Sequence, residues 1–112
     1  MPVDLERNTK LKAVLAELRR QFEALYGERL VKMVLYGSQA RGDAGRWSDI
    51  DVLVVLKGPV RHSQEVRRTG GIVSALCLDS ELDVQCLFMD EDQVRQHWMP
   101  LLRNISREGV EV

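Results

Sequence analysis

The sequence predicts an α/β (α+β) fold, in which helices flank a mixed β-sheet. Two patterns predict it. Apolar residues recur at helical spacing near the N-terminus, and the run from Ile50 to Leu56 is apolar at every position except Asp51. The first pattern is typical of an amphipathic helix, and the second of a central strand covered on both faces. The predicted order is helix, strand, strand, helix, strand, helix.

The first helix is predicted over residues 5–26, and Gly27 is a plausible stop. Residues 31–36 alternate in the manner of a strand, which Gly37-Ser38 breaks. Residues 38–41 can form one helical turn with Ser38 as its N-cap. The apolar face of the first helix consists of Leu11, Val14, Leu15, Leu18, Phe22 and Leu25.

Residues 42–48 contain two glycines, an aspartate and a serine, so we expect a loop there. The second strand is predicted over residues 49–56. Since the connection between the first two strands is too short for a full helical crossover, we expect that pair to be antiparallel.

A second helix is predicted over residues 62–78, and a third strand over residues 82–89. Asp90 can cap the next helix, with Gln93 at the spacing of a capping box. Pro100 ends that helix or starts a new turn. Residues 110–112 can add a short edge strand.

Size and composition indicate one globular domain over residues 1–112. The chain has 45% hydrophobic and 29% charged residues and a formal net charge of −1. That charge does not favour a broad electrostatic affinity for nucleic acid or an anionic membrane. Cys77 and Cys86 lack CxxC spacing, so we expect buried free thiols. No apolar run approaches a membrane span of about 18 residues and no signal peptide is evident, which favours a cytoplasmic location.

Gly37 and Ser38 are candidates for binding phosphate. Glycine permits close approach of the backbone to an anion. Ser38 offers a hydroxyl and, if a helical turn follows, N–H groups directed at the anion. Arg41 could neutralise a phosphate or brace the acidic loop. The alternatives are an ordinary turn and a surface arginine.

Asp49 and Asp51 are candidates for binding metal. In a strand these residues face the same way, with Cα atoms about 6.5 Å apart. Hard carboxylate oxygens suit Mg²⁺ or Mn²⁺. The alternative is a solvated strand end.

Asp83 is the candidate for a third carboxylate. If the third strand lies beside the second, Asp83 can approach Asp49 and Asp51. In a site that transfers a phosphate-containing group, it could then bind metal on the side of the acceptor and help to deprotonate the acceptor hydroxyl. Glu81 shares its strand face but lies nearer the turn, so Asp83 is preferred. The alternative for Asp83 is a charge at a half-exposed edge.

These residues resemble a known signature. Residues 37–42, Gly-Ser-Gln-Ala-Arg-Gly, followed by Ser-Asp-Ile-Asp at 48–51, are similar to the GSxARG…SDxD pattern of the minimal nucleotidyltransferases (MNT), in the DNA polymerase beta-like nucleotidyltransferase superfamily. The likeness is strong over residues 31–56. Asp83 matches the third-carboxylate position by its context alone.

The resemblance implies a nucleotidyltransferase fold, phosphate binding by Gly37 and Ser38, and magnesium binding by Asp49, Asp51 and Asp83. It implies ATP, or another nucleoside triphosphate, as donor. Small relatives are often paired with a separately encoded all-helical HEPN protein in a toxin–antitoxin system, and some adenylylate that partner.

Two functions follow as hypotheses. The first is an enzyme that transfers a nucleoside monophosphate, AMP above all, to a hydroxyl of a protein or small molecule. The second is a non-catalytic, antitoxin-like module that masks a helical HEPN partner. A structural domain with fortuitous acidic residues is a third interpretation. The sequence leaves open the acceptor, the base and the oligomeric state, and an exposed sheet edge or helix face would permit a homodimer.

Overall fold

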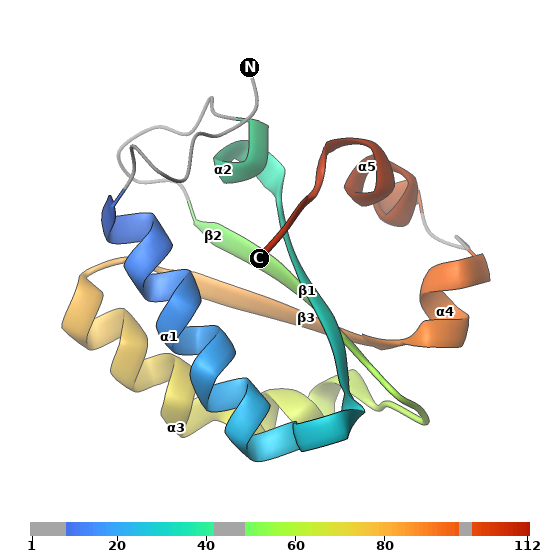
Figure 1. Cartoon of the computed structure of the whole chain (residues 1–112), viewed down its shortest axis with the longest axis horizontal. Coiled ribbons are helices and arrows are strands. Elements are labelled where there is room, and N and C mark those ends of the chain that lie inside the picture. The colour runs from blue at the N-terminus through green and yellow to red at the C-terminus, as the bar shows by residue number, and fades with distance from the viewer. Residues whose placement is uncertain (1–8, 42–48, 97–99) are drawn as a thin grey trace.

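The computed structural model describes residues 9–41, 49–96 and 100–112. Its four-stranded sheet has helices on both faces, with α1 and α3 on one side and α4 and α5 on the other (Figure 1). The elements are α1 (Thr9–Tyr26), the short 3₁₀ helix η1 (Gly27–Arg29), β1 (Leu30–Tyr36), α2 (Gly37–Arg41), β2 (Ile50–Leu56), α3 (His62–Ser80), β3 (Val84–Asp90), α4 (Glu91–Gln96), α5 (Pro100–Glu108) and β4 (Val110–Glu111).

The strand order in the sheet is β3-β2-β1-β4. β2 pairs antiparallel with β1 and parallel with β3, and β4 pairs antiparallel with the outer edge of β1. The helix α3 provides the long crossover that a parallel pair requires. The mixed sheet, the antiparallel first pair and the short edge strand are therefore as predicted.

β2 is the centre of the fold, since only Asp51 of its seven residues is not fully buried. Alternate side chains enter two separate cores. Ile50 and Val52 pack with α1 and α3, whereas Leu53 and Val55 pack with α5. This double burial explains why the strand has almost no polar position.

Two features of the long helices differ from the prediction. The apolar face of α1 ends on Tyr26, which is 7% exposed, whereas Leu25 is 43% exposed. Tyr26 continues the row of Leu18 and Phe22 at intervals of four, so it follows the helical period better. α3 continues through its glycine pair, as predicted, since packing against the sheet outweighs a weak helical propensity, and it ends at Ser80 instead of residue 78.

The other predicted features are partly described. α2 begins at Gly37, so Ser38 lies inside the helix and is not its N-cap. The amide of Asp90 donates to Oε1 of Gln93 at 3.0 Å, and the amide of Gln93 donates to Oδ1 of Asp90 at 2.9 Å, which confirms the capping box. The predicted loop 42–48 and residues 5–8 of the first helix lie outside the described residues.

Cys77 and Cys86 are free and half-buried. Burial raises the pKa of the Cys86 thiol to about 12. Among the helices of the described ranges, none combines the length and the apolar character that a bilayer crossing demands.

Candidate active site

Two neighbouring strands bring three carboxyl groups to one end of the sheet. Ile50 pairs with Val84, and the backbone N–H of Ile50 donates to the carbonyl of Asp83 at 2.8 Å. Because Ile50 and Val84 both point into the core below α1 and α3, the flanking aspartates lie on the opposite face. Asp83, which directly precedes β3, thus lies on the same face and at the same end of the sheet as Asp49 and Asp51.

Glu81 occupies a different place from Asp83. It follows α3 with a left-handed backbone (φ 60°), and its N–H donates to the carbonyl of Cys77 at 3.0 Å. It therefore ends the helix and lies outside the strand pairing that places Asp83.

The three carboxyl groups influence one another electrostatically. The pKa of Asp49 is raised by partial desolvation, by the negative charge of Asp83 and by a hydrogen bond with that carboxyl group. The pKa of Asp51 is raised by desolvation and then by the charges of Asp49 and Asp83. Such mutual repulsion is what a bound cation relieves.

The turn after β1 lies directly against this cluster. Gly37 has φ +74°, and a Cβ atom at this position would lie 2.7 Å from Oδ2 of Asp51. Only glycine fits there without displacement, because both the backbone conformation and the space oppose a side chain. The glycine of the motif thus places the start of α2 beside a carboxylate of β2.

Arg41 and Ser38 complete the predicted phosphate site. Nη1 of Arg41, at the end of α2, lies 3.4 Å from Oε2 of Glu108 in α5, so it links the two helices at an exposed position. The side chain of Ser38 lies outside the described residues, and the phosphate-binding roles of Gly37, Ser38 and Arg41 stay predictions.

Gln85 is a site residue that sequence analysis missed. Its Nε2 donates to Oδ2 of Asp49 at 3.0 Å. The signal available in the sequence was its position two residues after Asp83, which puts both side chains on one face of the chain. Tyr36 pairs with Asp51 on the neighbouring strand. Burial, followed by the charge of Asp51, raises the pKa of Tyr36 to about 12.

The donor set suits a divalent cation, although its arrangement is incomplete. Carboxylate oxygens are the ligands that Mg²⁺ and Mn²⁺ prefer. Within residues 9–41, 49–96 and 100–112, however, no three acidic, histidine or cysteine side chains are grouped closely enough to hold a metal ion. Asp49 is instead held by Asp83 and Gln85. Metal binding by Asp49, Asp51 and Asp83 therefore stays a prediction.

Comparison with known proteins identifies the class to which this fold and site belong. The family described as "Nucleotidyltransferase domain" matches residues 15–100. The match covers most of the chain and includes all three aspartates and the glycine turn. The chain belongs to the nucleotidyltransferase domain family, as the resemblance indicated.

Two curated relatives come from Methanocaldococcus jannaschii. The chain is 38% identical over 47 residues to "Putative protein adenylyltransferase MJ1305", covering 42% of this chain and 32% of the relative. It is 34% identical over 44 residues to "Putative protein adenylyltransferase MJ0141", covering 39% and 44% respectively. The similarity thus spans less than half the length of either relative.

Two solved structures share the fold. "Crystal structure of the toxin-antitoxin with AMP-PNP" superposes with a TM-score of 0.57 at 19% identity, over 83% of this chain and 68% of that chain. A "putative nucleotidyltransferase" from Sulfolobus solfataricus gives a TM-score of 0.58 at 22% identity, over 96% and 86%. These likenesses establish the nucleotidyltransferase-like fold.

Proposed function

We propose that this protein is a metal-dependent nucleotidyltransferase that transfers AMP from ATP to a hydroxyl group of a protein or small molecule. The observation that carries the proposal is the placement of Asp49, Asp51 and Asp83 at one end and on one face of the sheet, with Gly37 directly against Asp51. Family membership supports the nucleotide donor, and the names of the two curated relatives support adenylyl transfer to a protein.

Each residue has a distinct role in this proposal. The turn at Gly37 and Ser38, with Arg41, binds the triphosphate, and Asp49, Asp51 and Asp83 would hold Mg²⁺ or Mn²⁺. The bound metal supplies charge neutralisation for the phosphates. The acceptor oxygen forms a bond to the α-phosphorus, the bond from that phosphorus to the bridging oxygen breaks, and pyrophosphate leaves. Asp83 takes up the hydroxyl proton.

Nucleotide binding tests this proposal. ATP with Mg²⁺ should raise the melting temperature of the wild type, because a ligand that binds only the folded state stabilises it. Asp49→Asn with Asp51→Asn should abolish the metal-dependent part of that increase, which differential scanning fluorimetry measures. The matched control is Glu91→Gln with Asp92→Asn, which removes the same charge from exposed positions of α4 and should preserve the increase.

Calorimetric titration measures the binding of ATP and Mg²⁺ directly. A wild type that binds neither ATP nor Mg²⁺, alone or together with its partner, contradicts the enzymatic proposal. Labelling tests the transfer step itself. The wild type, incubated with radiolabelled ATP and candidate acceptors, should produce a labelled protein, and Asp83→Asn should not.

A masking function is the second candidate, since the described carboxyl groups do not form a three-ligand metal set. Here the chain acts as an antitoxin whose binding to a separately encoded, all-helical HEPN protein blocks that protein. The fold shared with a toxin–antitoxin structure supports such a partner. Inhibition of the partner that survives Asp51→Asn indicates masking. Inhibition lost in that variant, while the complex still forms, indicates catalysis.

A further inference from the structure

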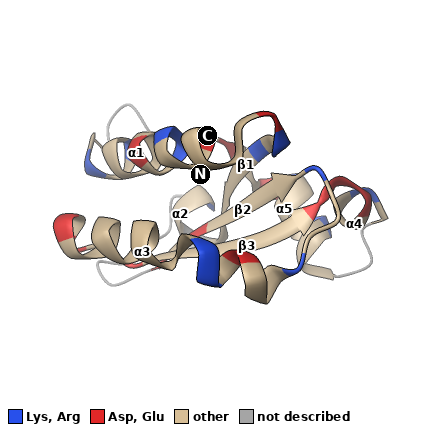
Figure 2. Ribbon diagram, turned by 90° about the horizontal axis from the view of Figure 1, so that it is seen from below, with Lys and Arg blue, Asp and Glu red and all other residues tan. Residues whose placement is uncertain are grey.

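The outer face of α3 is complementary to the same face of a second copy that runs in the opposite direction. Two exposed apolar residues, Val66 and Leu78, lie near its ends, with exposed fractions of 43% and 81%. Basic residues gather toward the start of the helix and acidic residues toward its end (Figure 2). The exposed charges are Arg61, Arg67 and Arg68 at the first end, and Asp79 and Glu81 at the second.

The middle of this face is made of small residues. Gly70, Gly71, Ser74 and Ala75 separate Val66 from Leu78, and a Cβ atom at either glycine would meet no atom within 4 Å. A second helix can therefore approach the backbone of α3 closely at this point.

A groove continues this face toward the edge of the sheet. It has a volume of about 340 Å³ and lies between α3 and β3, with Val66, Gly70 and Ser74 on one side and Cys86 and Phe88 on the other. Its lining is largely apolar, so burying it is favourable.

The edge of β3 itself is partly closed to an added strand. The N–H of Val84 donates to Sγ of Cys77 at 3.3 Å, and the N–H of Phe88 donates to Nδ1 of His62 at 3.1 Å. These outward-facing amides are therefore already bonded to side chains of α3. A partner on this side should meet the helix and the groove and not extend the sheet.

We infer that the α3 face, defined as Val66, Arg67, Gly70, Gly71, Ser74, Leu78 and Asp79 with the adjoining groove, binds a second copy of this chain. The two copies of α3 run antiparallel about a two-fold axis on the outer face, at the level of residue 72 along the helix, because Val66 and Leu78 are equally distant from that position in sequence. Val66 then lies against the partner's Leu78, and Arg67 lies near the partner's Asp79.

The distribution of charged residues on α3 favours a second copy of this chain over an unrelated partner. In a two-fold dimer each contact occurs twice, so a surface must be complementary to itself. A basic end and an acidic end, placed on either side of a small-residue centre, meet that condition in the antiparallel arrangement. The helical layer of α1 and α3 provides the interface, whereas the three aspartates lie on the opposite face of the sheet. The groove reaches the sheet edge at Gln85, which also donates to Asp49, so the interface borders the candidate active site at that residue.

Charge reversal tests the dimer sharply. Sedimentation velocity over micromolar concentrations should show a monomer–dimer equilibrium for the wild type. Arg67→Glu or Asp79→Arg alone should raise the dissociation constant about tenfold or more, because each substitution creates two like-charge contacts. The two together should restore affinity to within about threefold of the wild type, since the pair is re-formed with its signs exchanged.

Matched controls separate this face from general surface effects. Leu78→Lys on α3 should abolish the dimer, whereas Leu25→Lys, which changes an exposed leucine on α1, should preserve it. Arg95→Glu on α4 should also leave the dissociation constant unchanged.

Three outcomes overturn the inference. These are a monomeric wild type at every concentration, single reversals without effect, and a double reversal that fails to restore association. A wild type that is monomeric alone but binds a helical protein through Leu78 assigns the face to that protein instead. None of these outcomes bears on the Mg²⁺·ATP melting shift, so dimerisation and nucleotide transfer are tested independently.

Discussion

At the scale of single residues, Gly37 connects the phosphate-binding turn to the carboxylates. Its left-handed backbone turns the chain from β1 into α2, and its missing side chain leaves room for Oδ2 of Asp51. Gly27 has a similar backbone, with φ +56°, but no atom lies within 4 Å of its Cβ position. A side chain at Gly27 would therefore meet only an unfavourable backbone conformation, whereas a side chain at Gly37 would also clash with Asp51.

This difference yields a prediction. Gly27→Ala should lower the free energy of unfolding by about 1–2 kcal/mol, the cost of a left-handed conformation. Gly37→Ala should lower it further, because the new methyl group also displaces the Asp51 carboxylate, and should weaken Mg²⁺·ATP binding. Urea titration and calorimetry measure the two effects. Equal losses of stability for the two variants would show that the close approach to Asp51 has no energetic weight.

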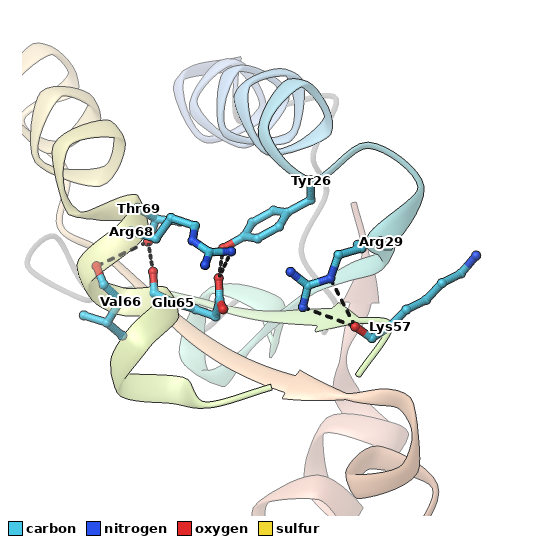
Figure 3. A network of polar contacts seen from close by, with 7 residues as sticks. All are labelled: Tyr26, Arg29, Lys57, Glu65, Val66, Arg68 and Thr69. Carbon is cyan, nitrogen blue, oxygen red and sulfur yellow. Dashed lines mark hydrogen bonds and ion pairs between the residues drawn. The ribbon is translucent and has the colours of Figure 1, made fainter. Parts of the chain in front are cut away.

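At the scale of elements, a buried polar contact joins α1 to α3 (Figure 3). The hydroxyl of Tyr26 donates to Oε1 of Glu65 at 2.7 Å, and Nη1 of Arg68 lies 3.4 Å from the same oxygen. Glu65 is only 3% exposed. Burial, and then the hydrogen bond and charge of Glu65, raise the pKa of Tyr26. A buried carboxylate requires such partners, so the contact fixes how the two helices pack.

Removing the hydroxyl tests this contact. Tyr26→Phe should lower the free energy of unfolding by about 1–3 kcal/mol, because Glu65 loses a donor while it stays buried. Tyr36→Phe is the control, since Tyr36 also has a raised pKa but is only half-buried and packs on the other core. Chemical denaturation measures both variants. A loss no greater for Tyr26→Phe than for the control would contradict the assigned role.

At the scale of the whole molecule, the candidate site opposes stability. The raised pKa values of Asp49 and Asp51 mean that the folded state binds their protons more tightly than the unfolded state does. Stability must then fall as pH rises from the unfolded carboxyl value of about 3.9 through the folded values. The protein thus tolerates carboxylate repulsion at neutral pH, as sites shaped by function commonly do.

The pH dependence can be measured directly. In the presence of a chelator, Asp49→Asn should raise the melting temperature at pH 7, because the neutral amide ends the repulsion with Asp83 while keeping an acceptor for Gln85. The gain should fade toward about pH 4, where wild-type carboxyl groups become protonated. Asp92→Asn, at an exposed ion pair with Arg95, should produce no gain. A gain from Asp49→Asn that is constant with pH would contradict repulsion as its cause.

Particular residues show how far sequence analysis reached. The apolar run of β2 predicted a central strand because a strand buried on both faces can have few polar positions. The face of α1 was predicted correctly except at its last turn, where Tyr26, and not Leu25, continues the row of Leu18 and Phe22 and packs against Phe88. Gln85 was missed because its partner, Asp49, directly precedes another strand and is distant in sequence.

The sequence by itself determined the elements, the antiparallel first pair and the motif that places the chain among nucleotidyltransferases. These features depend on local periodicity, on short connections and on residue chemistry, all of which are written within a few neighbouring positions. Only the tertiary structure decided that Asp83 and Gln85 lie beside Asp49, that Gly37 abuts Asp51, and that the outer face of α3 stays exposed. Each of these depends on strand register and helix packing, which are set by contacts between residues distant in sequence.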